Sequence, residues 1–411
     1  MAARLSVWLY GIRVATIDEQ RGRLSLDYTE EALTRFPLGA PLLSLRLPLS
    51  VQRFEHQTVQ AFVDGLLPEG DQRRAIAQDL RLLADNTFGL IRALGRECAG
   101  AIVILPEGDA LPSPPTTLTA APLSDAGIGR LVANLRSAPL GFGARVRLSL
   151  AGVQEKLLLT RLPDGSWGQP VDGTPSTHIL KPPLAGYGRT VENELFCMRF
   201  AGRLGLSVAH VETLAVAGRP MLLVERYDRL VHADGTVERI HQEDLCQALG
   251  FPPSRKYEED RGPSLRQIAR LLGGVVGRDA VETLLRATVF NLLVGNGDAH
   301  AKNFSLLHDP GGAVRLAPLY DLMSSRIYGD ARLAMKIDGE ARMDRVSAER
   351  VLDEAATWGL RRAAALEVVE ELLERVPEAV SAAEADVSDA PAALGPLIDG
   401  VRAGLKGHDG D

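Results

Sequence analysis

The sequence predicts an α+β protein with a β-rich lobe followed by a mostly helical lobe. Apolar residues alternate with polar ones through residues 145–170 and again before Tyr227, which is typical of strands. After Tyr227 the apolar spacing becomes helical. The stretch 106–122, PEGDALPSPPTTLTAAP, carries five prolines, so we expect a linker there that closes a small N-terminal α+β unit.

The N-terminal unit begins with RLSVWLYGIRVATI (4–17), which predicts a β-hairpin turning at Tyr10-Gly11. SLRLPLS (44–50) predicts another short strand. Helical spacing then runs from about Val59 to Leu94, and AGAIVILPEG (99–108) predicts a strand.

Beyond the linker, residues 145–170 predict hairpins, with Asp164-Gly165 as a turn signal. We expect a strand in THILKPP, a helix in TVENELFCMRFAGRLGL that ends at Gly205, and two strands around AGRP. VETLLRATVFNLLVG predicts a long helix stopped by Gly295, and helical spacing continues from 345 to a polar tail. The predicted domains are 1–108, a linker at 109–122, 123–227 and 228–411.

Composition restricts the class of protein. The formal net charge is −7, which argues against a whole-molecule nucleic-acid binder. Cys98, Cys197 and Cys246 match no zinc spacing, and so sparse a set is typical of a reducing compartment. With no predicted signal peptide or membrane span, we expect a cytoplasmic protein and no membrane contact.

The stretch NLLVGNGDAHAKNFSLL (291–307) places polar groups between two apolar runs. Asp298 and Asn303 show the spacing D-x-x-x-x-N, in which protein kinases use the Asp to orient the attacking hydroxyl and the Asn to bind Mg²⁺. Lys302 could meet phosphate, and His300 could brace the loop or touch the nucleotide. A surface turn is the alternative, because the spacing also arises by chance.

The other parts of such a site occur in a suitable order. Asp321 in LAPLYDLMSS could be the second Mg²⁺ ligand, and Lys181 in HILKPP could be a phosphate lysine borne on a strand. Glu194, or else Glu192, on the following helix could orient that lysine. Taken singly, each of these residues is explained as well by a helix cap or by a solvated strand end. Phosphoryl transfer is favoured by the order in which the residues occur, across a β-rich lobe and then a helical lobe.

A phosphate loop has one weak candidate. The sequence contains no G-x-x-x-x-G-K-[ST] motif, which excludes a Walker-type loop. SLAGVQEK (149–156) could instead bring backbone N–H groups of Ala151, Gly152, Val153, Gln154 and Glu155 to phosphates, with Lys156 nearby. A hairpin turn is the alternative.

Taken in order, these segments resemble a known family. SLAGVQEK, HILKPP, ENELFCMRFAGRLGL, LLVERYDR, HQEDLCQALG, NGDAHAKN and PLYDLMSS are similar to the HipA-type serine/threonine kinase toxins of bacterial toxin–antitoxin systems. FVDGLLPEGDQRR and LGRECAGAIVILPEG resemble the family's N-terminal subdomain. The resemblance implies a bilobal protein-kinase-like fold and phosphorylation of protein hydroxyls that depends on ATP and Mg²⁺.

The resemblance also implies roles for individual residues. Asp298 would be the catalytic base, and Asn303 and Asp321 the Mg²⁺ ligands. Residues that would contact the nucleotide are Lys181, Glu225 and Tyr227 at the adenine hinge, His300, Lys302 and the loop 149–156. Ser149 matches the family's regulatory autophosphorylation site, where an added phosphate would repel ATP and eject the loop.

Expected partners follow from the same resemblance. They are a protein substrate, for which an aminoacyl-tRNA synthetase is one candidate, and a HipB-like helix-turn-helix antitoxin that would make the DNA contacts. Two alternatives stay open: a phosphotransferase for an aminoglycoside or a sugar, and a catalytically silent module that binds an antitoxin.

Overall fold

The computed structural model describes residues 3–111, 120–141, 149–152, 154–171, 173–232 and 234–406. The chain forms two compact units. The first contains Met1–Pro182, Leu214–Pro253 and Leu306–Ala313; the second contains Pro183–Thr213, Ser254–Ser305 and Val314–Asp411.

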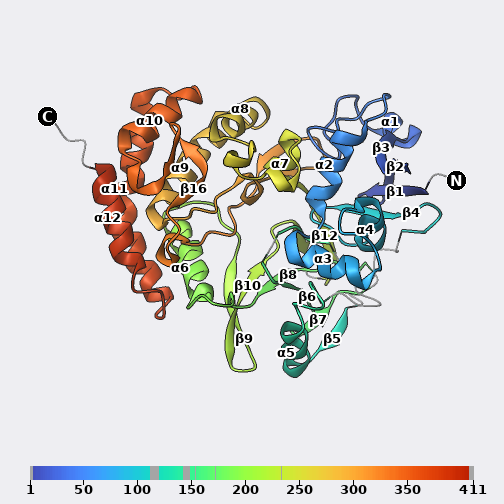
Figure 1. Cartoon of the computed structure of the whole chain (residues 1–411), viewed down its shortest axis with the longest axis horizontal. Coiled ribbons are helices and arrows are strands. Elements are labelled where there is room, and N and C mark those ends of the chain that lie inside the picture. The colour runs from blue at the N-terminus through green and yellow to red at the C-terminus, as the bar shows by residue number, and fades with distance from the viewer. Residues whose placement is uncertain are drawn as a thin grey trace. The chain divides into compact units, whose positions relative to one another are not determined.

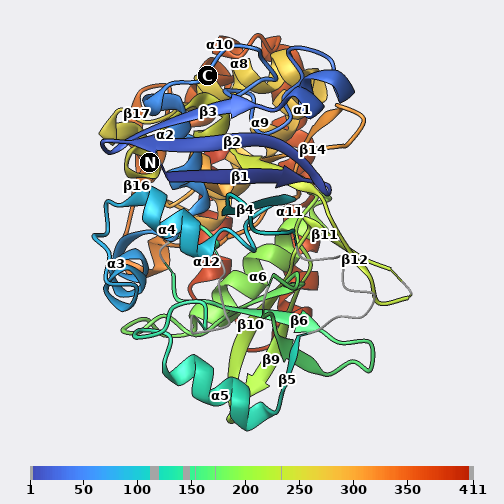
Figure 2. The same cartoon turned by 90° about the vertical axis from the view of Figure 1, so that its right-hand side faces the viewer.

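The first unit opens with a four-stranded antiparallel sheet in the order β3-β2-β1-β4 (Figure 2). Its strands are β1 (Ala3–Leu9), β2 (Ile12–Gln20), β3 (Arg23–Tyr28) and β4 (Ile102–Pro106). Helices in this part are α1 (Glu30–Arg35), α2 (His56–Leu66), α3 (Gly70–Asp79) and α4 (Thr87–Leu94). The predicted hairpin is confirmed: Tyr10 and Gly11 both take positive φ, which lets the tight turn join β1 to β2.

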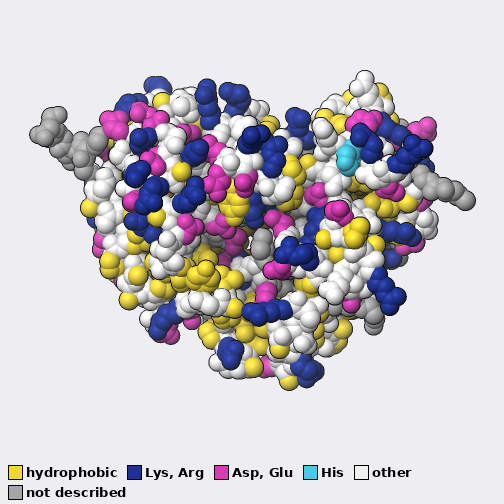
Figure 3. All heavy atoms as spheres, in the orientation of Figure 1, with side chains coloured by type: hydrophobic (Ala, Val, Ile, Leu, Met, Phe, Trp, Pro, Cys, Tyr) yellow, Lys and Arg dark blue, Asp and Glu magenta, His cyan; other side chains and the backbone are white. Residues whose placement is uncertain are grey.

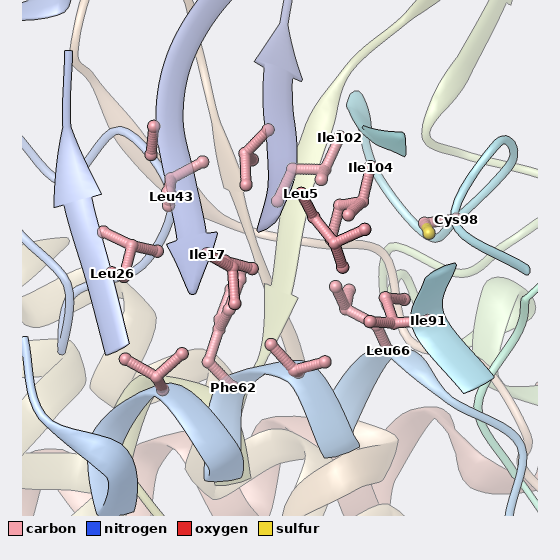
Figure 4. Close-up of a cluster of buried hydrophobic side chains, with 14 of the residues drawn as sticks. Leu5, Ile17, Leu26, Leu43, Phe62, Leu66, Ile91, Cys98, Ile102 and Ile104 are labelled. Carbon is pink, nitrogen blue, oxygen red and sulfur yellow. The ribbon is translucent and has the colours of Figure 1, made fainter. Parts of the chain in front are cut away.

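The core of this part lies between the sheet and helix α2. Figure 4 shows Leu5, Ile17 and Leu26 of the strands facing Phe62 and Leu66 of α2. The same cluster includes Ile91, Cys98, Ile102 and Ile104. Alternating apolar residues on the strands and helical spacing on α2 therefore meet in one continuous core.

The strand predicted at 44–50 is wrong. Only an isolated bridge between Ser44 and Leu47 forms there, closing a tight turn. The backbone N–H of Leu45 donates instead to the carboxylate of Glu243, at 2.8 Å, and Pro48 has no N–H to offer a neighbouring strand.

A six-stranded sheet follows in the order β5-β7-β6-β8-β10-β9. The strands are β5 (Ala121–Leu123), β6 (Leu157–Arg161), β7 (Trp167–Gln169), β8 (His178–Lys181), β9 (Val211–Val216) and β10 (Arg219–Glu225). The unit also contains α5 (Asp125–Ala133), β11 (Arg229–Val231), β12 (Val237–Arg239), β13 (His241–Asp244) and α7 (Leu245–Leu249). The hairpin predicted at Asp164-Gly165 and the strands around AGRP are confirmed.

The second unit is mostly helical (Figure 1). Its helices are α6 (Thr190–Arg203), α8 (Leu265–Val275), α9 (Arg278–Val294), α10 (Ala348–Thr357), α11 (Arg362–Asp386) and α12 (Leu394–Lys406). Phe200 of α6 packs against Phe290 of α9 with ring centroids 5.3 Å apart, and Phe196 packs against Phe200 with centroids 6.0 Å apart. The predicted ends of α6 and α9 are confirmed, since Gly205 and Gly295 both take positive φ just beyond them.

Residues after Tyr227 are less uniformly helical than predicted. Besides β11–β13, they contain β14 (Ser305–His308), β15 (Val314–Leu316), β16 (Arg332–Ile337) and β17 (Glu340–Arg342). Single 3₁₀ turns are η1 (Pro253–Arg255), η2 (Glu258–Asp260), η3 (Ala301–Asn303), η4 (Arg326–Tyr328) and η5 (Met343–Arg345). These elements are too short to produce a periodic pattern.

The surface carries both signs of charge. On the face drawn in Figure 3, basic and acidic side chains are interspersed. Within the described ranges, none of the helices has the length and apolar character needed to cross a membrane.

Candidate functional site

The loop that carries Asp298 follows the most deeply buried helix of the second unit. Helix α9 ends at Gly295 (φ 66°), and the next turn is clamped on both sides. The N–H of Gly297 donates to Ser325 Oγ at 2.9 Å, and its carbonyl accepts the N–H of Ala334 at 2.8 Å. A side chain at Gly297 would collide with the backbone of β16, so a close backbone approach requires glycine here.

Asp298 is bonded to its own loop through its backbone. Its carbonyl accepts the N–H of His300 at 2.7 Å and Nδ2 of Asn303 at 3.0 Å. Because Nδ2 is held in this way, the amide oxygen of Asn303 points away from that carbonyl. The spacing of five residues therefore joins the carboxylate and the amide in one small turn ending in η3.

The Asp298 side chain has one protein partner of note. Tyr257 donates its phenolic hydrogen to Oδ1 at 2.7 Å, while the side chain is still 57% exposed. Hydrogen bonds from the described residues to this carboxylate fall on Oδ1 alone. Oδ2 is therefore the oxygen that remains for an incoming group.

Asp298 also lies in an electrostatically mixed environment. Desolvation raises the pKa of Asp298 above its usual range, the hydrogen bond from Tyr257 opposes that rise, and the charge of Asp321 adds to it. Lys256 lowers the same pKa. Two acids close enough to disfavour each other's charge are the arrangement that a cation would relieve.

Asp321 lies on a separate segment, which is held by hydrogen bonds of the residues just before it. Leu319 forms a parallel bridge with Val208, and the hydroxyl of Tyr320 donates to the carbonyl of Lys302 at 2.6 Å. Asp321 itself takes φ 59°, a left-handed conformation that costs a non-glycine residue free energy and is found disproportionately at functional sites.

A buried amide braces the segment just after Asp321. Asn193 of α6 donates to the carbonyl of Ser324 at 2.9 Å and accepts its N–H at 3.1 Å. Its Nδ2 also lies 3.2 Å from the hydroxyl of Tyr328. The second unit thus supports Asp298 and Asp321 from different helices, α9 and α6.

The other predicted residues of this loop are buried. His300 and Lys302 are 5% and 7% exposed, and the ring of His300 packs edge-on to Tyr257 with centroids 5.2 Å apart. His300 Nε2 lies 4.0 Å from Asp298 Oδ1. The structure therefore gathers Asp298, His300, Lys302, Asn303 and Asp321 within the second unit.

The predicted phosphate loop belongs to the first unit. Ser149 is fully buried, and its hydroxyl donates to the carbonyl of Leu66 at 2.5 Å. Lys156 Nζ donates to the carbonyl of Ala151 at 2.7 Å across Gly152, whose φ of 116° favours glycine.

Two further positions of this loop contact other residues of the first unit. The carbonyl of Gln154 accepts a hydrogen bond from Gln72 of α3 at 2.5 Å. Glu155 pairs with Arg136 at 3.2 Å. Val153 lies outside the described residues.

The remaining predicted residues are divided between the units. Lys181 ends β8 opposite Leu222 of β10 and is 8% exposed. Glu225 is exposed and Tyr227 is half-buried, with its hydroxyl bonded to Gln242. Glu194 lies on α6 in the second unit and is 3% exposed.

Tyr257 was absent from the sequence-based prediction. It lies 41 residues before Asp298 in a stretch with no periodic pattern, so only the tertiary structure reveals the contact. Glu97 was missed as well, although a glutamate that leads into the apolar stretch CAGAIVIL (98–105) is a visible signal.

Comparison with known proteins decides the family. A model of the HipA-like C-terminal domain matches residues 148–380, and a model of the HipA N-terminal domain matches residues 5–105. The chain belongs to the HipA family. The two matches of this HipA-family chain cover the motifs on which the resemblance was based, except for residues 106–108.

Curated relatives agree with this assignment. The HipA-family chain is 42% identical to the putative kinase Y4mE of Sinorhizobium fredii over 398 residues, covering 94% of this chain and 93% of the relative. It is 34% identical to the serine/threonine-protein kinase toxin HipA of Shewanella oneidensis over 384 residues, covering 88% and 86%. The protein is therefore a HipA-family kinase.

The fold agrees too. A solved Shewanella oneidensis structure, of HipA with HipB and its operator DNA, superposes with a TM-score of 0.83 at 28% identity, covering 98% of this chain and 95% of that one. The predicted kinase-like α+β fold of the HipA family is confirmed.

Proposed function

We propose that this HipA-family kinase is the toxin of a toxin–antitoxin module and phosphorylates protein serine or threonine with Mg-ATP. The observation that carries the proposal is the turn 298–303. In this turn the solvent-exposed carboxylate of Asp298 and the hydrogen-bonded amide of Asn303 have the sequence spacing of a kinase catalytic loop. The kinship to a serine/threonine-protein kinase toxin supports the nature of the acceptor.

Asp298 is assigned the role of base. Its Oδ1 is bonded to Tyr257, so the carboxylate is oriented, and Oδ2 accepts the hydrogen of the incoming hydroxyl. As the oxygen–phosphorus bond forms, that proton passes to Oδ2 and the nucleoside diphosphate leaves. The raised pKa of Asp298, caused first by desolvation, favours acceptance of this proton.

Asn303 and Asp321 are assigned to the metal. Among the described residues, no group of three or more His, Cys, Asp and Glu side chains could hold a metal ion. A site with two protein oxygens fits Mg²⁺, which takes its other ligands from phosphates and water. The bound ion would neutralise charge on the phosphate oxygens. The fixed amide of Asn303 and the strained backbone of Asp321 are consistent with such a site.

Further residues are assigned to the nucleotide. Lys181, His300 and Lys302 would contact phosphates, the backbone of 151–156 would cover them, and Glu225 and Tyr227 would line the adenine hinge. Glu194 would orient Lys181. These assignments rest on the family resemblance and on the residue types present.

Ser149 is assigned a regulatory role. Its hydroxyl is fully buried and donates to the carbonyl of Leu66, an acceptor that cannot bond to a phosphate oxygen. Phosphorylation would therefore require residue 149 to leave this position and would keep it from returning. Autophosphorylation would then displace the phosphate loop and switch the kinase off.

The proposed partners are a HipB-like antitoxin and a protein substrate. The solved relative binds HipB and operator DNA, which supports an antitoxin that makes the DNA contacts here. We propose a component of translation, such as an aminoacyl-tRNA synthetase, as the substrate, and therefore a cytoplasmic location.

The test is to incubate the purified chain with radiolabelled ATP and cytosolic extract, and to identify labelled proteins and sites. Label on serine or threonine of a discrete protein supports the proposal. ATP consumption driven only by an aminoglycoside or a sugar would indicate the small-molecule alternative. Failure to bind Mg-ATP would indicate the silent binding module.

A further inference from the structure

Glu97 and four other charged side chains lie together in the first unit. We call them the Glu97 cluster, which consists of Glu97, Arg226, Asp228, Arg229 and Arg239. The side chains of all but Arg239 are at most 3% exposed, and that of Arg239 is 14% exposed. Three guanidinium groups therefore face two carboxylates away from water.

Glu97 is the centre of this cluster. Its Oε1 lies 3.2 Å from Arg226 Nη1 and 2.9 Å from Arg229 Nη2, and its Oε2 lies 2.6 Å from Arg239 Nη2. Ser176 adds two hydrogen bonds to Oε1, from its N–H at 3.0 Å and its hydroxyl at 3.1 Å. One carboxylate thus holds four residues that are distant in sequence.

The cluster includes the buried residues of the proposed adenine hinge, residues 225–229. Arg226 and Asp228 are buried and bond to each other at 2.7 Å, whereas Glu225 and Tyr227, which alternate with them, are exposed and half-buried. The inward-facing pair therefore sets the position of the backbone from which Glu225 and Tyr227 project.

The segment that carries Glu97 holds the start of the phosphate loop as well. The carbonyl of Glu97 accepts the N–H of Ser149 at 2.7 Å. The carbonyl of Cys98 accepts hydrogen bonds from Arg226 at 3.2 Å and from Arg229 at 3.0 Å. The N–H of Gly100 donates to Asp228 at 2.7 Å.

The segment that carries Glu97 packs into the apolar core of the first unit. Cys98 belongs to the apolar core drawn in Figure 4, and so does Leu66, the residue that accepts the hydroxyl of Ser149. Buried ion pairs seldom add net stability over apolar residues of similar size, because desolvation offsets the attraction between the charges. We therefore infer that the cluster serves to fix the position of the backbone segments that it joins.

We propose that Glu97 is a positioning residue for nucleotide binding, which holds the hinge 225–229 and the start of the phosphate loop at Ser149 on one segment of the N-terminal domain. The inference rests on the proposed function, since it takes 149–156 and the hinge as parts of the ATP site. The N-terminal domain would then contribute to ATP binding by positioning these segments.

The experiment compares the full chain with Glu97→Gln by calorimetric titration with Mg-ATP and by ADP release at saturating ATP. We expect the Kd and KM for ATP to rise at least about tenfold with kcat little changed, because misplacement of binding groups by ~1 Å has effects of this order or larger. A folded Glu97→Gln chain that binds ATP within about twofold of the parent would overturn the inference. Absence of Mg-ATP binding by the parent chain would refute the proposed function instead.

Two further variants keep the result decisive. Ser176→Ala removes one hydrogen bond to Glu97 without changing charge. If Glu97→Gln does not fold, a Kd for ATP raised about threefold by Ser176→Ala supports the inference, and an unchanged Kd refutes it.

Asp18→Asn is the matched control, because Asp18 pairs with Arg4 at 2.6 Å in the β1–β2 hairpin, away from the hinge and the phosphate loop. It should lower the melting temperature and leave the Kd for ATP unchanged; a Kd raised equally by Asp18→Asn would show that Glu97 acts only through stability.

Discussion

Tyr257 donates a hydrogen bond of 2.7 Å to Oδ1 of Asp298 and packs edge-on against His300. The phenol thereby selects one orientation of a carboxylate that is otherwise 57% exposed. A base held in this way presents its second oxygen to the acceptor hydroxyl in a constant direction.

Tyr257→Phe should lower kcat about tenfold while leaving the Kd for Mg-ATP unchanged, because it frees the Asp298 carboxylate to rotate but keeps the ring packed on His300. Steady-state kinetics and ATP titration measure the two effects. Tyr187→Phe is the matched control, since Tyr187 is 53% exposed and lies outside the site. Equal kcat for Tyr257→Phe and the parent would remove Tyr257 from the mechanism.

Substitution of the two acids should separate base from metal ligand. Asp298→Asn keeps an acceptor for Tyr257 but no longer takes a proton, so phosphorylation should fall about 10²–10⁴-fold with ATP binding retained. Asp321→Asn should instead weaken the binding of Mg-ATP itself. If both variants kept turnover within a few-fold of the parent, the assigned roles would be wrong.

Ser149→Asp should imitate the phosphorylated state. A carboxylate cannot donate to the carbonyl of Leu66, so the loop should leave its position and ATP affinity should fall at least about tenfold. Ser149→Ala loses only the hydroxyl and should still bind ATP, while the parent should acquire a phosphate that Ser149→Ala does not. Normal ATP binding by Ser149→Asp, measured by calorimetry, would count against this regulation.

Acid should destabilise the first unit through His241. Burial, aided by the neighbouring His308, lowers the pKa of His241 from the ordinary value of 6.5 to about 3. Between these values the unfolded chain binds a proton that the folded chain does not. The free energy of unfolding should therefore fall by about 1.4 kcal/mol for each pH unit below 6.5.

His241→Gln tests this, because its Nε2 can still donate to the carbonyl of Leu43, as His241 does at 2.9 Å. Urea denaturation at pH near 7 and near 5 should show a drop in stability for the parent that exceeds the drop for His241→Gln by about 2 kcal/mol. Equal drops would mean that His241 does not titrate on unfolding in this range.

Much of the fold could be predicted because its signals are local. The hairpin at Tyr10-Gly11, helices α2, α6 and α9, and the glycine stops of α6 and α9 follow from periodicity and turn chemistry within a few residues. The segment 44–50 failed because its alternation is satisfied by burial in a turn bonded to Glu243, 198 residues away, instead of by a partner strand.

The candidate site also has a part that the sequence could predict and a part that only the tertiary structure shows. Spacing alone predicted that Asp298 and Asn303 share a turn, since a five-residue separation leaves the chain few ways to place them, and the order of the motifs predicted the family. Tertiary structure alone decided that Tyr257 bonds to Asp298 across 41 residues and that Glu97 meets Arg226 across 129. Such contacts depend on how separate elements pack, and an isolated tyrosine or glutamate carries no periodic signal of its future partner.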